Sequence, residues 1–252
     1  MFLVDTNADT VAVDGNVSLR EAIQAANTNA PVNEAPAGTP GGDSITFNLS
    51  AGNETITLGG TQLDTIVEEL SIDGDNTAGS GTDVTIDGDA SSRIFAANTS
   101  DTVDLDNMTI TNGFVAGDGG AIHQTGGGTL NVTGATVENS SAGGAGGGIY
   151  VDSGTLVVDA SSVLNNDAAI TGGGIHTEGT TTVENGSSVS GNDAGTDGGG
   201  IYTASPLTVD NATIASNTAS GAGATNGGGG IFNAGSGTLN LNNSANVTNN
   251  TA

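Results

Sequence analysis

The chain contains no cysteine and no lysine, and its only side chains with a permanent positive charge are Arg20 and Arg93. Without cysteine it can form no disulfide, no thiolate metal site and no cysteine nucleophile. Against the two arginines stand 28 acidic residues, which give a formal net charge of −26. Because nucleic acids and anionic membrane surfaces attract clusters of lysine and arginine, we expect neither as a partner.

Long apolar runs are also absent. No stretch approaches the roughly 18 consecutive apolar residues of a transmembrane helix, so we expect no membrane insertion. Residues 1–5 lack the basic region and long apolar core of a signal peptide. If the protein is exported, we therefore expect its leader to be absent from this chain.

Tryptophan is missing and aromatic residues make up only 3% of the chain. The core must then be a narrow one, built from Ile, Val, Leu, Ala and Thr. The acidic excess without lysine fits two alternatives, a generic acidic secreted surface or a protein adapted to high salt, in which screening relieves the repulsion between carboxylates.

What the chain does have is a Gly-Gly-Ile repeat. The repeated isoleucines are Ile122, Ile149, Ile175, Ile201 and Ile231, separated by 27, 26, 26 and 30 residues. Self-similarity at 20–50 residues is typical of a solenoid, in which each repeat buries its apolar face against its neighbours.

Each repeat contains short strands rather than helices. After Gly-Gly-Ile comes an alternating pair such as Leu156 and Val158, and then a single aliphatic residue such as Val163. This period-2 pattern predicts three short strands per repeat. An asparagine follows the third strand, and we expect these asparagines to stack as a ladder: Asn112, Asn139, Asn166, Asn192, Asn217 and Asn250. The fold class predicted is all-β, a right-handed parallel β-helix.

One helix is predicted near the start. Ser18 and Glu21 form a capping-box pattern, and Leu19, Ala22 and Ile23 begin one apolar face. We therefore expect residues 1–40 to form an N-terminal strand and a capping helix. Residues 41–252 would form the β-helix, with repeats of 26–27 residues that are clearest from residue 105.

Phe2-Leu3-Val4-Asp5 and Ser18-Leu19-Arg20-Glu21-Ala22-Ile23 resemble the beginning of CSLREA-type secreted proteins, with Val17 in place of the first cysteine. Ile72-Asp73-Gly74 and Thr109-Ile110-Thr111-Asn112-Gly113 continue the likeness. The Gly-Gly-Gly-Ile repeats resemble polymorphic outer-membrane-type and pectin-lyase-like β-helices. The resemblance implies a right-handed β-helix on a secreted or surface-attached protein, usually of unknown activity.

The two ends of such a rod differ. The predicted helix would cover the N-terminal coil, whereas no cap is evident near Val247. An open coil exposes strand edges and an apolar slice of core, which favours association. Either more protein follows Ala252, or the open end docks head-to-tail on another copy, with the strand of residues 2–4 against it, and forms a filament.

One side chain follows each repeated isoleucine and shares one phase of the repeat: His123, Tyr150, His176, Tyr202 and Phe232. By alternation this column points outward. It is either a carbohydrate-binding stripe or an aromatic ladder that covers the turn. His123 and His176 lie two turns apart, about 10 Å, which is too far to share one metal ion.

Acidic and glycosylation motifs give two further candidate sites. Asp73, Asp75, Asp87 and Asp89 form the densest acidic cluster, so Ca²⁺ is a possible ligand there and no other cofactor is expected. The candidate N-glycosylation sites are Asn48, Asn98, Asn107, Asn131 and Asn211, each in an Asn-x-Ser/Thr motif.

We predict no catalytic residues. The chain is interpreted as a non-catalytic extracellular structural or adhesive β-helix, with itself and polysaccharide as possible partners. The alternative is a carbohydrate-active enzyme, a polysaccharide lyase or hydrolase, using a groove of the solenoid. Its only available basic residue would be Arg93, which lies near Asp87 and Asp89 in sequence. The other interpretation of Arg93 is a surface partner of those carboxylates.

Overall fold

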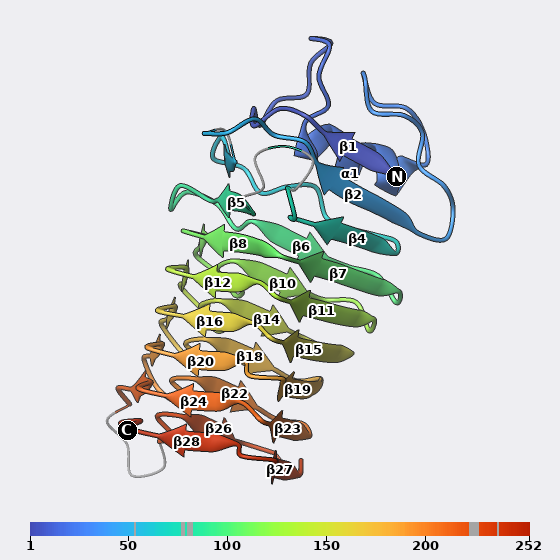
Figure 1. Ribbon diagram of the computed structural model, residues 1–252. Coiled ribbons are helices and arrows are strands. Elements are labelled where there is room, and N and C mark those ends of the chain that lie inside the picture. The colour runs from blue at the N-terminus through green and yellow to red at the C-terminus, as the bar shows by residue number, and fades with distance from the viewer. Residues whose placement is uncertain (53, 77–78, 80–82, 222–226, 236) are drawn as a thin grey trace.

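The protein is a parallel β-solenoid with one short helix at its N-terminal end, as a computed structural model shows (Figure 1). The structure describes residues 1–252 except residues 53, 77–78, 80–82, 222–226 and 236. The predicted β-helix is therefore confirmed. Coils stack along one axis, and every ladder between the strands of successive coils is parallel and in register, as in the pairing of Ile149 with Ile175 and of Ile175 with Ile201.

Each full coil passes through four sheets. The nine-stranded sheet contains β1 (Phe2–Val4), β2 (Asp43–Phe47), β4 (Leu70–Asp73), β7 (Thr102–Asp106), β11 (Thr129–Thr133), β15 (Thr155–Asp159), β19 (Thr180–Glu184), β23 (Leu207–Asp210) and β27 (Leu239–Asn242). The eight-stranded sheet contains β3 (Thr55–Thr57), β5 (Val84–Asp87), β8 (Met108–Thr111), β12 (Thr136–Glu138), β16 (Ser162–Leu164), β20 (Ser188–Ser190), β24 (Thr213–Ala215) and β28 (Asn246–Thr248).

The other two sheets are shorter. The six-stranded sheet contains β6 (Phe95–Ala97), β10 (Ile122–Gln124), β14 (Ile149–Val151), β18 (Ile175–Thr177), β22 (Ile201–Thr203) and β26 (Ile231–Asn233). The five-stranded sheet contains β9 (Phe114–Val115), β13 (Ser141–Ala142), β17 (Asp167–Ala168), β21 (Asp193–Ala194) and β25 (Thr218–Ala219). This fourth strand adds to the three predicted per repeat. It was not predicted because two residues are too few to show an alternating pattern.

The core is a narrow column of aliphatic side chains. Ile149, Ile175 and Ile201 are each fully buried and lie one above another, which confirms the predicted isoleucine column. Inward residues of the nine-stranded sheet, such as Leu156 and Val158, are equally buried. The buried cluster runs without a break from Phe2 to Ile214, and Ile231 of the next coil is only partly buried against it.

Asparagines form a buried ladder where the eight-stranded sheet turns toward the five-stranded sheet. The side-chain oxygen of Asn192 accepts hydrogen bonds from the backbone N–H of Asn166 at 2.9 Å and from its amide at 3.1 Å. Asn217 does the same for Asn192, and Asn250 for Asn217. Backbone groups turned inward at this corner thus find partners in the coil beside them.

Two of the predicted ladder residues do not belong to it. Asn112 and Asn139 lie one position earlier, at φ of 55° and 52°, and shape the turn in the left-handed region that asparagine tolerates. Ser140 occupies the ladder position of its coil and accepts a hydrogen bond from the Gly113 N–H at 3.0 Å. The prediction was wrong for these two because the turn residue and the ladder residue are adjacent and both are often asparagine.

The repeated glycines make room for this ladder. A Cβ atom on Gly174 would lie 2.8 Å from the Gly200 carbonyl oxygen and 2.9 Å from the Asn192 amide nitrogen. Any side chain there would push the coil away from its neighbour. The glycine repeat is therefore required by the close packing of each glycine against the asparagine ladder.

The N-terminal end is covered by the helix α1 (Leu19–Thr28), as predicted. Both halves of the capping box are formed, with the Ser18 N–H donating to Glu21 Oε2 at 3.0 Å and the Glu21 N–H donating to Ser18 Oγ at 3.2 Å. Leu19, Ala22 and Ile23 are buried against β1 and β2. The strand β1 pairs with β2 of the same chain and forms the N-terminal edge of the nine-stranded sheet.

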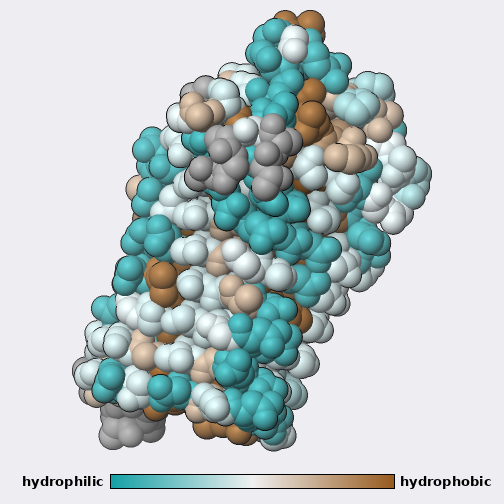
Figure 2. Space-filling view, viewed as in Figure 1, coloured by the Kyte–Doolittle hydropathy of each residue, from teal (hydrophilic) through white to brown (hydrophobic). Residues whose placement is uncertain are grey.

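The opposite end is open. β26, β27 and β28 form the last coil, and Leu239, Leu241 and Val247 are 40%, 52% and 42% exposed. With Ile231 they line a hollow of about 420 Å³. In Figure 2 hydrophobic atoms gather at this lower end of the molecule, where Figure 1 places β27 and β28.

Candidate functional site

The outward residues of the six-stranded sheet form the predicted aromatic column. Tyr150 and His176 stack with ring centroids 4.7 Å apart at 13°, His176 and Tyr202 at 4.5 Å and 10°, and Tyr202 and Phe232 at 5.6 Å and 16°. His123 meets Tyr150 edge to face at 5.0 Å and 88°. The parallel pairing of β10, β14, β18, β22 and β26 places these residues in direct register.

The stacking decides what the column can offer to a ligand. From Tyr150 to Phe232 the rings lie nearly parallel, so each ring covers the face of the next. His176 is only 6% exposed. The column therefore presents ring edges and the hydroxyl groups of Tyr150 and Tyr202, rather than open faces on which a sugar ring could stack.

Carboxylates flank this column. Asp152 Oδ2 lies 3.5 Å from His123 Nε2, and Glu178 Oε1 lies 4.0 Å from His176 Nε2. Burial lowers the pKa of His176 to about 4, although Asp118 and Asp152 oppose the shift. His176 is therefore a neutral imidazole at neutral pH, and its Nδ1 lies 2.8 Å from the Thr171 hydroxyl.

The other members of the column are also neutral at neutral pH. Burial lowers the pKa of His123, with Arg93 adding to the effect. Burial raises the pKa of both Tyr150 and Tyr202, and nearby carboxylates raise it further. Neutral rings stack without charge repulsion, which favours the close packing seen along the column.

The predicted calcium residues lie at the ends of strands from two different sheets and just beyond those ends. Asp73, in β4, accepts hydrogen bonds at Oδ1 from the Asn107 amide at 3.0 Å and the Asp75 N–H at 3.1 Å. Asp87, in β5, accepts them from the Asn112 amide at 3.0 Å and the Asp89 N–H at 2.8 Å. Among the described residues, no group of three or more His, Cys, Asp or Glu side chains is placed to hold a metal ion.

Four of the five candidate glycosylation residues are exposed: Asn48, Asn98, Asn107 and Asn211. Asn131 is half-buried, and its amide donates to Asp104 Oδ1 at 2.7 Å. The amide of Asn107 is likewise engaged by Asp73. Asn48, Asn98 and Asn211 are therefore the more accessible candidates.

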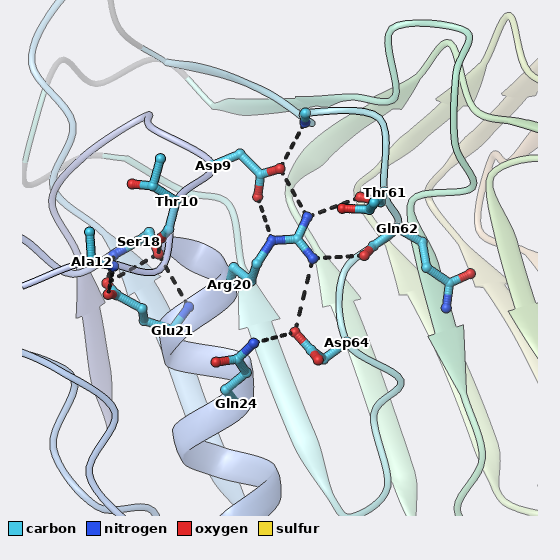
Figure 3. Close-up of polar contacts among 11 residues, drawn as sticks. Asp9, Thr10, Ala12, Ser18, Arg20, Glu21, Gln24, Thr61, Gln62 and Asp64 are labelled. Carbon is cyan, nitrogen blue, oxygen red and sulfur yellow. Dashed lines mark hydrogen bonds and ion pairs between the residues drawn. The ribbon is translucent and has the colours of Figure 1, made fainter.

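Arg20 joins the capping helix to the first coil (Figure 3). It binds Asp9 through Nε and Nη2, both at 2.9 Å, and donates to the Gln62 carbonyl at 2.7 Å and the Thr61 carbonyl at 2.9 Å. A bidentate arginine–carboxylate pair is a strong and well-oriented contact. Arg20 is thus part of the cap.

Arg93 does not lie where its sequence neighbours suggested. Its Nε and Nη2 donate to the carbonyl oxygens of Gly119 at 2.9 Å and Asp118 at 2.7 Å, and its Nη1 to Gln62 Oε1 at 3.1 Å. The expected pairing with Asp87 and Asp89 is therefore wrong. The guanidinium instead bridges the preceding coil, at Gln62, and the following coil, at Asp118 and Gly119.

Sequence reasoning missed the hollow beside Arg93. It measures about 280 Å³ and is lined by Gly60, Thr61, Gln62, Ser91, Ser92, Arg93, Phe114, Val115 and Ala116. These residues come from three separate segments, and only the folded coils bring them together.

No helix among the described residues has the length and apolar character needed to cross a membrane. Comparison of the chain with protein-family models, with curated proteins and with solved structures found no match.

Proposed function

We propose that the protein is a non-catalytic extracellular β-helix that serves as a structural and adhesive module at a cell surface. The observation that carries this proposal is that the repeated side chains contact one another from coil to coil. The aromatic rings stack on one another, and the asparagines hydrogen-bond from coil to coil. These repeats support a rigid rod with one face repeated along it.

The adhesive part of the proposal rests on the edge of the aromatic column. Tyr150 and Tyr202 supply hydroxyl groups two coils apart. Glu178 lies beside His176 between them, and Asp152 lies beside His123 in the coil before Tyr150. Hydroxyls and carboxylates hydrogen-bond readily to sugar hydroxyls. A neutral polysaccharide lying along the column would meet a repeating row of such groups.

The extracellular location is proposed on the resemblance to CSLREA-type secreted proteins and polymorphic outer-membrane-type repeats. The acidic surface agrees with it, because net charge keeps an exposed module soluble. Under this proposal the exposed side chains of Asn48, Asn98 and Asn211 are the preferred glycosylation sites in a host that glycosylates asparagine.

Binding to insoluble polysaccharides tests the adhesive role. The double variant Tyr150→Phe/Tyr202→Phe removes both hydroxyls and keeps the rings stacked, so we expect several-fold weaker retention at an unchanged melting temperature. The control variant Thr182→Val removes a hydroxyl from the outward side of the nine-stranded sheet and should bind as the unmodified protein does. Equal retention of all three proteins would refute the role of the column.

A second candidate function, head-to-tail assembly, is favoured by the last coil. Leu239, Leu241 and Val247 expose an apolar slice of the core beside unpaired strand edges, and such surfaces associate. We propose that in a chain of residues 1–252 this face docks on another copy.

Sedimentation and electron microscopy at rising concentration test the assembly. The wild type should form end-to-end oligomers, and the double variant Leu239→Asp/Leu241→Asp should remain monomeric. The control Val67→Asp changes a side chain that is 50% exposed elsewhere and should leave assembly intact. A wild-type chain of residues 1–252 that stays monomeric at every concentration would contradict the proposal.

A further inference from the structure

Arg93 is a partly buried arginine that forms no ion pair with a carboxylate among the described residues. Burial lowers the pKa of its guanidinium, and the charge of Asp118 partly offsets this effect. Its three hydrogen bonds end on two backbone carbonyls and one amide oxygen. Among the described residues its side chain forms no ion pair within 4.0 Å, whereas Arg20 is paired with Asp9 at 2.9 Å.

This arrangement is unusual for so acidic a chain. With 28 carboxylates and two arginines, an arginine would be expected to find a carboxylate nearby. Buried charges are normally paired, because removing an ion from water is costly. A guanidinium has five N–H donors, and the hydrogen bonds of the described residues use three of them. One N–H therefore remains on each Nη nitrogen.

Ser92 also lines the hollow, but its hydroxyl oxygen is buried in the protein and is not accessible from the hollow. Arg93 is therefore the charged group that an anionic ligand in the hollow would meet.

Phe114 supplies an apolar wall. It lies in β9, the N-terminal edge strand of the five-stranded sheet, and it is 44% exposed while it lines the hollow. A cavity of about 280 Å³ admits a single small ring. Gln62 completes the wall, with its backbone carbonyl turned to Arg20 and its side chain directed away from Arg20 (Figure 3) and bound to Arg93.

From this geometry we propose that the hollow is a binding site for a small monocarboxylate with a flat apolar face. The carboxylate is held by Arg93, and the apolar face of the ligand lies against Phe114. The site goes beyond the structural and adhesive role, and it uses none of the residues of the aromatic column.

The charge of the whole chain sharpens the expected selectivity. A net charge of −26 disfavours anions over the whole surface, so a ligand is retained only where it fits Arg93 and the apolar wall of the hollow. Ligands with two or more carboxylates should bind less well than monocarboxylates, because the second charge has no cation to meet.

Nuclear magnetic resonance of the arginine side chains tests the site on the unmodified protein. The chain contains only Arg20 and Arg93, so two Nε–H signals are expected and Arg20 is an internal control. Benzoate and glucuronate are titrated separately at constant ionic strength, with glucose and acetate as probes that lack the charge and the flat face. We expect the Arg93 signal to shift saturably with benzoate or glucuronate, with a dissociation constant on the order of 1 mM, and the Arg20 signal to stay in place.

The outcomes separate the sources of the ligand. Saturation by glucuronate but not benzoate identifies a sugar acid, and the reverse identifies an aromatic acid, and both support the site. Equal saturation by acetate overturns the role of the flat face. A dissociation constant weaker than about 10 mM for both ring acids, or equal shifts of both arginines, overturns the proposal.

Variants test the individual contacts. Phe114→Ala should weaken binding about tenfold, because the apolar contact is lost and the charge is kept. Ile170→Ala, at an exposed aliphatic residue away from the hollow, is the matched control and should bind normally. Unchanged affinity in Phe114→Ala would contradict the assigned contact.

Discussion

Replacing Asn192 by alanine removes the centre of the asparagine ladder. The Asn192 side chain is 1% exposed and makes four hydrogen bonds, two to Asn166, one to the Val163 carbonyl and one to Asn217. Alanine leaves the buried Asn166 N–H without its acceptor, which costs about 1–3 kcal/mol, and each further bond contributes about 0.5–1.5 kcal/mol. Asn217 Oδ1 still accepts from the Asn192 backbone N–H. Summed over the four bonds, these values predict that Asn192→Ala lowers the free energy of unfolding by about 2.5–7.5 kcal/mol.

Hydrogen exchange and urea unfolding measure this effect locally and globally. The Asn166 amide should lose protection more than amides in distant coils, because the damage starts at that donor. Asn192→Ser should fall between, since Ser140 fills the same position in its own coil. The control is Asn165→Gly, at an exposed turn residue with φ of 53°, where glycine keeps the backbone conformation. Equal effects of Asn192→Ala and Asn165→Gly would refute the ladder argument.

Three further predictions concern salt, pH and the cap. The melting temperature should rise between low and molar NaCl, because screening relieves repulsion in a chain of net charge −26, and a flat profile would count against this. Because the pKa of His176 is lowered from 6.5 to about 4 in the fold, the unfolded chain binds the proton first, so stability should fall as pH drops through that window, and less so in His176→Phe. Ser18→Ala should cost about 1 kcal/mol in urea unfolding, since it breaks the capping box, whereas Thr28→Ala at the other end of α1 should cost less.

Those parts of the fold that depend on local repetition could be predicted from the sequence. The inward positions Ile149, Ile175 and Ile201 recur at a nearly constant interval, and stacking coils in register is the arrangement that buries all of them. The capping helix was predictable because Ser18 and Glu21 lie three residues apart before an apolar face.

The errors in the asparagine ladder arose because the turn position and the ladder position of a coil are adjacent and both can be asparagine. Asn139 and Asn166 recur 27 residues apart, yet one shapes a turn and the other forms the ladder, and only the backbone conformation distinguishes them. The two-residue strand Asp167–Ala168 left no periodic pattern to read.

The candidate site was predictable in part. The aromatic column follows from the repeat, but the stacking that covers its ring faces depends on side-chain rotation. The direction of Arg93 could not be predicted, because Gly119 and Gln62 lie 26 and 31 residues away in sequence. Charge and sequence proximity favoured Asp87, whereas the stacking of coils decided the contact.

Incubating the purified protein with a panel of polysaccharides, and measuring both bound protein and released soluble sugar, tests the central claim most directly. The account predicts retention on at least one polysaccharide with no reducing or unsaturated sugar released at any time, with or without Ca²⁺. Release of such products in proportion to protein concentration would contradict a non-catalytic role.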